Sequence, residues 1–262
     1  MPVPVPTLAD RDVERYLDRI GAARPSRPDL ASLATLQLTH LQRVPFENLD
    51  IGWGVSIVLG LDAVLDKVVE RRRGGYCYEL NSAFGALLAT LGYGVEYVSA
   101  RVARREGGFG PDFDHLALVV QADGQRVPAL VDVGFGDGSS APLPLVHERE
   151  QPDGMRRVRV VRDGDEWSYE EDGGDGWQVR YRVDPRPREL REFAAMNEWQ
   201  QSSPDSPFVA RTICSLLTPT GRITVSAGRL IVSEGTERSE RELHDDELES
   251  ILRERFGIEP SP

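Results

Sequence analysis

The stretch Arg-Arg-Arg-Gly-Gly-Tyr-Cys-Tyr-Glu-Leu-Asn, residues 71–81, joins a Gly-Gly turn to a run of helical periodicity. Cys77 stands directly after the turn, where a helix is expected to begin. The first turn of a helix has unpaired N–H groups and a partial positive charge, and both favour the thiolate form of a cysteine. Cys77 is therefore a candidate nucleophile. A free cysteine is also often a plain core residue, so this interpretation needs partner residues.

Apolar residues recur at helical spacing on both sides of this stretch. The spacing predicts helices over residues 7–20, from 28 to 44, over 62–72 and over 77–92, with a loop at 44–50. Thr7 and Asp10 form a capping pattern at the start of the first helix. The first 92 residues are therefore predicted to form a helical bundle.

The period changes after residue 92 to that of short strands with Gly, Pro and Asp turns between them. Strands are predicted at 95–102, 115–120, 130–135, 158–161, 167–169 and 177–183. These strands suggest a mostly antiparallel sheet or barrel. A helix follows at 189–199, then a Ser/Pro linker, a hairpin at 222–232 and a last amphipathic helix.

Composition excludes several classes of protein. The 262 residues are 40% hydrophobic and 28% charged, which is typical of a soluble globular protein. The start has neither a basic nor an apolar leader region, and no run reaches the length of a membrane span, so we expect a cytoplasmic protein. The net charge of −12 argues against nucleic-acid and anionic-membrane partners. With only two cysteines, Cys77 and Cys214, reduced thiols are expected.

A cysteine nucleophile needs a base, and the chain has four histidines. Three of them lie where capping, packing or exposure is the simple interpretation, whereas His115 opens a predicted strand. Asp132 lies inside an apolar run, where an unpartnered carboxylate would be costly to bury. The turn at 122–124 between them suggests that their strands are neighbours. Cys77, His115 and Asp132 are therefore predicted to be nucleophile, base and orienting carboxylate.

Five motifs in this order resemble the bacterial type of the arylamine N-acetyltransferase family, from the N-terminal helices to about Phe208. They are Val-Pro-Phe-Glu-Asn-Leu-Asp at 44–50, Arg-Arg-Gly-Gly-Tyr-Cys-Tyr-Glu-Leu-Asn at 72–81, Asp-His-Leu-Ala-Leu-Val at 114–119, Val-Asp-Val-Gly-Phe-Gly at 131–136, and Asn-Glu-Trp-Gln-Gln-Ser-Ser-Pro-Asp-Ser-Pro-Phe at 197–208. The resemblance implies an α+β fold with a helical bundle at 1–92, a β-barrel domain at 93–200 and an α/β lid at 201–262. It also implies a papain-like Cys-His-Asp triad.

The resemblance implies roles for further residues. Glu47 and Arg73 match a buried pair that holds the active-site loop, and Asn81 matches a residue supporting the same region. The positions implied to contact substrates are Phe46, Val102 and Phe135 for the acceptor, and Gly134 and Gly136 for the pyrophosphate of coenzyme A. Phe46 and Phe135 also fit ordinary core positions, because pockets and cores use the same residues.

The activity implied by the resemblance is acetyl transfer from acetyl-CoA to an arylamine or arylhydrazine through Cys77, without a metal. Three alternatives remain open. An ansamycin amide synthase would use the same triad on an acyl chain from a carrier protein. A thiol hydrolase or transglutaminase-like enzyme also uses Cys, His and Asp in this order, and a binding module would keep the triad without catalysis.

Overall fold

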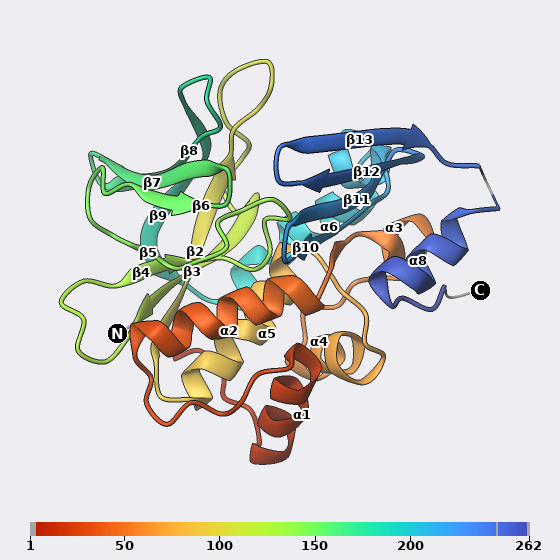
Figure 1. Cartoon of the computed structure of the whole chain (residues 1–262). Helices are drawn as coiled ribbons and strands as arrows, with labels where there is room; N and C mark the ends of the chain where they lie inside the picture. The colour runs from red at the N-terminus through yellow and green to blue at the C-terminus, as the bar shows by residue number, and fades with distance from the viewer. Residues whose placement is uncertain (1–3, 245, 261–262) are drawn as a thin grey trace.

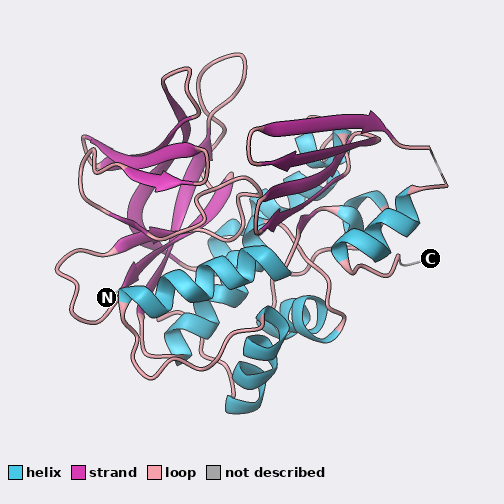
Figure 2. Cartoon of the chain, in the orientation of Figure 1, coloured by secondary structure: helices cyan, strands magenta, loops and turns pink. Residues whose placement is uncertain are grey.

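A computed structural model describes residues 4–244 and 246–260. Helices precede and follow a sheet of eight strands along the chain, and a second sheet has five strands (Figures 1 and 2). The N-terminal part contains α1 (Asp10–Ile20), α2 (Leu30–Arg43), β1 (Phe46–Glu47), α3 (Leu49–Gly52), α4 (Leu61–Leu65), a π-helix (Asp66–Glu70) and α5 (Cys77–Thr90).

Helix α1 forms because its apolar residues share one face that packs into the core. The apolar residues buried on this face are Val13, Tyr16, Leu17 and Ile20. Burial of a large apolar side chain contributes about 1.5–3 kcal/mol. The helix begins at Asp10, and Ala9 caps it without a side-chain hydrogen bond. The predicted capping by Thr7 is therefore wrong, because the helix begins three residues after it.

The predicted helix at 62–72 is divided into α4 and the π-helix Asp66–Glu70. It ends before Arg72, whose φ of 52° lies in the left-handed region. The buried Arg19 guanidinium group donates hydrogen bonds to the carbonyl groups of Val68, Arg72 and Arg73. These bonds from α1 hold the segment that leads to Cys77.

Helix α5 lies in the centre of the protein. Residues 77–88 are all buried, between the other helices and the strands of the larger sheet. A helix that is apolar on nearly every side is expected in such a position. One polar contact also links it to the sheet, because the Tyr97 hydroxyl donates to the Ser82 carbonyl at 3.0 Å. The helix that begins at Cys77 is therefore fixed on all sides.

The larger sheet runs in the order β5-β4-β3-β2-β9-β8-β7-β6, and its neighbouring strands are antiparallel. Its strands are β2 (Gly94–Val102), β3 (His115–Gln121), β4 (Ala129–Val131), β5 (Leu143–Pro144), β6 (Gln151–Asp153), β7 (Arg156–Asp163), β8 (Glu166–Asp172) and β9 (Trp177–Arg188). The sheet is nearly closed, because the Glu148 amide after β5 donates to the Val160 carbonyl of β7 at 2.9 Å. The predicted antiparallel barrel is confirmed.

Strands β3 and β4 are neighbours, as the turn between them predicts, and Leu118 pairs with Val131. However, β4 ends at Val131, so the predicted strand at 130–135 is too long. Asp132 is the next residue, and its Oδ1 accepts the Gly134 N–H at 2.9 Å. A side chain that bonds the main chain two residues on makes a turn, which is why the strand stops there.

The C-terminal part begins with a 3₁₀ turn (Leu190–Phe193), which replaces the first turn of the predicted helix at 189–199. It continues with α6 (Ala194–Ser202), α7 (Pro207–Ala210), β10 (Ile213–Thr218), β11 (Gly221–Ser226), β12 (Arg229–Glu234), β13 (Glu237–Glu242) and α8 (Leu248–Phe256). The predicted hairpin and last helix correspond to β11, β12 and α8. The smaller sheet runs in the order β1-β10-β11-β12-β13.

Strand β1 lies within the segment predicted as a loop, together with α3. It joins the C-terminal sheet, because Phe46 pairs with Ser215 and Glu47 with Cys214. A strand of two residues is too short to show a periodicity in the sequence, so only its pairing with β10 identifies it as a strand. The division of the chain at residues 92 and 200 stays a prediction.

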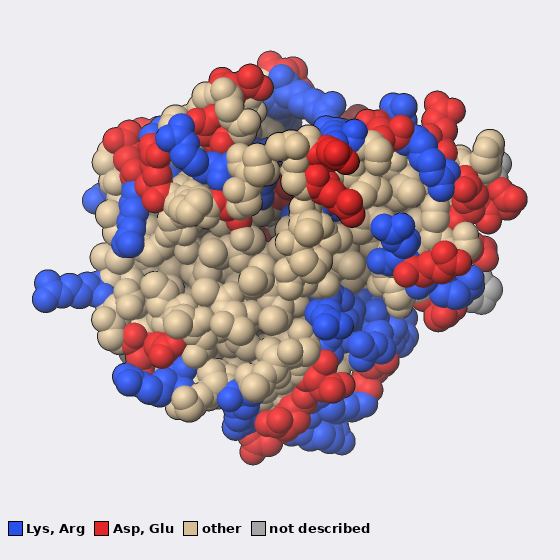
Figure 3. Space-filling model, viewed as in Figure 1, with Lys and Arg blue, Asp and Glu red and all other residues tan. Residues whose placement is uncertain are grey.

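In the view of Figure 3, charged side chains gather over the barrel and the C-terminal sheet, whereas the area over α2 is largely uncharged. Within residues 4–244 and 246–260, no helix is long and apolar enough to cross a membrane.

Candidate active site

Cys77 is the first residue of α5 and is 3% exposed. The Tyr76 amide before it donates to the Glu79 carboxylate at 3.1 Å, which caps the helix start. Gly74 lets the chain pass very close to another segment, because a Cβ there would lie 1.9 Å from the Pro45 carbonyl oxygen. The Gly-Gly turn thus places Cys77 at a helix start, as its sequence pattern predicts.

His115 and Asp132 come from neighbouring strands and meet beside Cys77. His115 is the first residue of β3, and its Nε2 lies 2.7 Å from Oδ2 of Asp132. Cys77 is close enough to the His115 ring to raise the pKa of the imidazole. Both His115 and Asp132 are buried. The structure therefore brings the three residues predicted from the sequence together in one array, in which His115 is hydrogen-bonded to Asp132.

Asp132 accepts hydrogen bonds from three further groups. Asn81 Nδ2 and the Gly134 amide each lie 2.9 Å from Oδ1, and the Tyr181 hydroxyl lies 3.0 Å from Oδ2. Burial alone would raise the pKa of Asp132, but His115 and these donors outweigh it and lower the pKa. Asp132 is therefore held as a carboxylate that faces His115.

The charge of His115 follows from this arrangement. Burial lowers the pKa of the imidazole. The Asp132 carboxylate and the neighbouring Cys77 outweigh burial and raise the pKa to about 10. The ring is therefore an imidazolium at neutral pH. A positive charge beside a cysteine suits a residue that reacts as a nucleophile.

Tyr181 is a site residue that sequence reasoning missed. It lies on β9, and its ring is 5.2 Å from that of His115 between centroids. The strand pattern of 177–183 predicts alternate inward residues, but it does not say which of them reaches across the barrel to Asp132. Only the three-dimensional arrangement of the strands shows that Tyr181 on β9 meets Asp132 at the end of β4.

The residues expected around the substrates lie in different surroundings. The Phe135 ring stands edge-on to His115 at 5.4 Å, and the Phe46 ring packs against Phe208 at 6.2 Å. Gly134 lies against the helix start, because a Cβ there would be 2.6 Å from Cys77 Cα. These contacts place Phe135 and Gly134 at the array itself.

Gly136 and Val102 are the other two residues expected to contact substrates, and each lies next to an aromatic residue. A Cβ at Gly136 would lie 3.0 Å from the Phe46 ring, so this glycine lines the same aromatic group. Val102 lies at the end of β2, opposite Tyr181, and is half-buried.

A buried group of charges supports the loop before Cys77. Arg73 Nη2 contacts Glu47 at 2.8 Å, as expected for the implied pair, and it also contacts Asp50 at 2.9 Å. Lys67 Nζ lies 2.7 Å from Asp50 and 2.8 Å from Glu79. Asp50, Lys67 and Glu79 were not expected here.

Lys67→Met is expected to lower the free energy of unfolding by about 3–5 kcal/mol, because it leaves the buried Glu79 carboxylate without its cation and Asp50 with Arg73 alone. Urea unfolding followed by circular dichroism measures this change. Arg71→Met is the matched control, because the Arg71–Asp66 pair is exposed and worth at most about 1 kcal/mol. Equal unfolding midpoints for the two variants would show that the buried charges do not stabilise the loop.

Comparison with known proteins agrees with this geometry. Residues 29–261 match the protein family described as N-acetyltransferase. The arylamine N-acetyltransferase of Mycolicibacterium smegmatis is 33% identical, over 95% of this chain and 92% of its own. The pineal gland isozyme of arylamine N-acetyltransferase from Gallus gallus is 33% identical, over 94% of each chain.

Solved structures give the same result. The Nocardia farcinica arylamine N-acetyltransferase has a TM-score of 0.88 and 34% identity, over 95% of this chain and 90% of that chain. The Mycobacterium marinum arylamine N-acetyltransferase in complex with CoA has a TM-score of 0.88 and 32% identity, over 94% and 92%. With this sequence similarity, this barrel and this array of Cys77, His115 and Asp132, the chain belongs to the arylamine N-acetyltransferase family.

Proposed function

We propose that this protein transfers an acetyl group from acetyl-CoA to the amine of arylamines and arylhydrazines, through an acetyl group held on Cys77. The observation that carries the proposal is the array of Cys77, His115 and Asp132, with the His115–Asp132 hydrogen bond beside Cys77 at the start of α5. Acetyl-CoA as the donor and arylamines as acceptors follow from the family. Hydrazines are the further acceptor class, because they offer a similar nucleophilic nitrogen.

In the first step, the Cys77 thiolate attacks the thioester carbonyl carbon of acetyl-CoA. A new bond forms between the Cys77 sulfur and the acetyl carbon, and the bond to the coenzyme A sulfur breaks. His115 donates its proton to the leaving thiolate, and Asp132 holds the ring in place during this transfer. The Cys77 amide, at a helix start, is the proposed donor to the carbonyl oxygen.

In the second step, the acceptor nitrogen attacks the acetyl carbon on Cys77. The carbon–nitrogen bond forms, the bond to the Cys77 sulfur breaks, and His115 takes the proton that the nitrogen loses. Phe46, Val102 and Phe135 are the proposed acceptor contacts. Phe135 suits this role, because its ring already contacts His115. Gly134 and Gly136 are proposed to contact coenzyme A through their main chain, because Gly134 lies against Cys77 and Gly136 against the Phe46 ring.

Incubation with acetyl-CoA alone tests the proposal. One equivalent of coenzyme A is expected to be released rapidly, with one acetyl group on the Cys77 peptide and none on the Cys214 peptide. Addition of an arylamine is then expected to give continuous release of coenzyme A. Continuous release without an amine would indicate a thiol hydrolase instead. If no acetyl group reaches Cys77, the proposal fails, and an acyl chain on a carrier protein becomes the substrate to test.

A further inference from the structure

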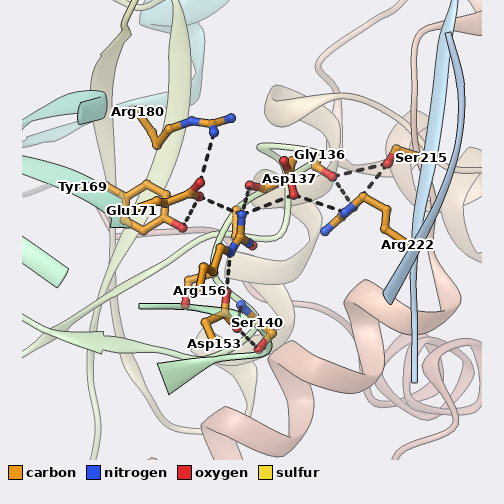
Figure 4. Close-up of polar contacts among 12 residues, drawn as sticks. Gly136, Asp137, Ser140, Asp153, Arg156, Tyr169, Glu171, Arg180, Ser215 and Arg222 are labelled. Atoms are coloured by element: carbon orange, nitrogen blue, oxygen red, sulfur yellow. Dashed lines mark hydrogen bonds and ion pairs between the residues drawn. The ribbon is translucent and has the colours of Figure 1, made fainter. Parts of the chain in front are cut away.

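A second group of charges joins the barrel to the C-terminal sheet, apart from the loop that precedes Cys77. Its centre is Asp137, whose Oδ1 lies 3.3 Å from Arg156 Nη1 and 3.3 Å from Arg222 Nε (Figure 4). Arg156 belongs to β7 of the barrel, and Arg222 belongs to β11 of the C-terminal sheet. One carboxylate therefore connects two parts of the fold.

Arg222 also holds the main chain of the same segment. Its Nη1 donates to the Gly136 carbonyl and, at 3.2 Å, to the Ser215 hydroxyl. The side chain is 16% exposed, so these bonds form largely away from water. We call Asp137, Arg156 and Arg222 the Asp137 latch.

Arg156 extends the group inside the barrel. It donates to the Gly138 carbonyl at 2.6 Å and contacts Glu171 at 3.0 Å. Glu171 also pairs with Arg180 at 3.0 Å, and the Arg180 guanidinium lies 5.5 Å from the centre of the Phe135 ring. A continuous line of contacts thus runs from the latch to the ring that stands against His115.

The charges of this group balance, which argues against an anion site. Its three cations face three carboxylates: Arg156, Arg180 and Arg222 against Asp137, Asp153 and Glu171. A site for a phosphate would need uncompensated positive charge. The arrangement instead fits a structural connection to the segment at 133–138.

The other end of this segment touches the catalytic array directly. The Val133 amide donates to Asn81 at 3.0 Å, and the Gly134 amide donates to Asp132 at 2.9 Å. Gly134 packs so tightly against Cys77 that no side chain fits between them. A shift of this segment would therefore move partners of Asp132, Cys77 and His115 together.

We propose that Arg222 is a positioning residue: from the C-terminal sheet it holds Gly136 and Asp137, so that the segment 133–138 keeps Asp132 and Phe135 set against Cys77 and His115. The inference rests on the proposed function, because it assigns Arg222 an effect on the acetylation of Cys77. Arg222 contacts none of the three array residues and acts through the segment.

Arg222→Met tests the inference, because it removes the bonds to Gly136 and Asp137 and keeps an unbranched side chain. The rate of Cys77 acetylation in a single turnover is expected to fall about tenfold, since small displacements of reacting groups reduce rates strongly. Alkylation of Cys77 by iodoacetamide at pH 7 is expected to slow as well. The KM for the arylamine is expected to stay within about twofold, because positioning acts on kcat.

Two variants serve as controls. Arg229→Met removes an arginine from β12 of the same sheet, where it pairs with Glu240 at 2.9 Å, and it is expected to leave both rates unchanged. Arg222→Lys is expected to recover part of the lost rate, because an ammonium group can still contact Gly136 or Asp137. Melting temperatures of all variants separate positioning from loss of folded protein.

Rates for Arg222→Met equal to those of Arg229→Met would overturn the inference. If Arg222→Met does not fold, Asp137→Asn decides, because it removes the half-exposed carboxylate and leaves the Gly136 bond intact. Slower acetylation in a folded Asp137→Asn protein supports the latch, and an unchanged rate contradicts it. Failure of the unmodified protein to acetylate Cys77 would contradict the proposed function instead.

Discussion

Cys77→Ala is expected to abolish acetyl transfer, with a loss of turnover on the order of a millionfold. The alanine has no group that can hold the acetyl chain, so the first step cannot occur. Cys77→Ser is expected to be nearly as inactive, because a hydroxyl ionises far less readily than a thiol. Release of coenzyme A in a single turnover, followed with a thiol reagent after removal of protein, measures both variants.

The matched control is Cys214→Ala. Cys214 is a free, buried thiol on β10, where it pairs with Glu47 in the C-terminal sheet. Its removal is expected to leave turnover within a few-fold of the unmodified protein. Near-normal turnover in Cys77→Ala, or loss of turnover in Cys214→Ala alone, would show that Cys77 is not the nucleophile.

Asp132→Asn is expected to lower kcat by about 10⁴-fold, as the loss of an orienting carboxylate does in other triads. The carboxylate accepts from His115, Asn81, Gly134 and Tyr181, and an amide would turn one acceptor into a donor among these groups. The variant therefore loses both the charge and the geometry that fix His115.

Asp132→Asn is also expected to change the pKa of His115 and, with it, the reactivity of Cys77 at a given pH. The Asp132 carboxylate raises the pKa of His115 to about 10 against the effect of burial, so its removal lowers that pKa. The imidazolium beside the Cys77 sulfur is then lost at a lower pH than in the unmodified protein. Alkylation by iodoacetamide at pH 7 is expected to slow in Asp132→Asn. Asp175→Asn, in an exposed hairpin turn, is the control. An unchanged alkylation rate in Asp132→Asn would mean that Asp132 does not set the charge of His115.

The parts of the site that depend on local signals could be predicted from the sequence. Cys77 follows a Gly-Gly turn and begins an apolar-periodic run, so its helix start is a local property. The short turn between the strands of His115 and Asp132 indicates their pairing, which the structure confirms. Asp132 itself was placed inside a strand, because its apolar neighbours hid the turn that it makes with Gly134.

The parts that depend on distant segments could not be predicted. Tyr181 reaches Asp132 only because the barrel nearly closes, and no period in β9 marks that residue. Lys67 and Glu79 are ordinary charged residues in a helical pattern, and their burial follows from the packing of the π-helix and α5 against the segment at 44–50. Periodicity reports which face is apolar, but not which buried charges meet.

Strand β1 has a consequence for synthesis of the protein. Phe46 and Glu47 leave the ribosome well before Ser215 and Cys214, their partners in β10. A nascent chain can therefore carry Cys77, His115 and Asp132 while the segment before Cys77 still lacks its neighbouring strand. The segment before Cys77 is paired on this side only after β10 has been synthesised.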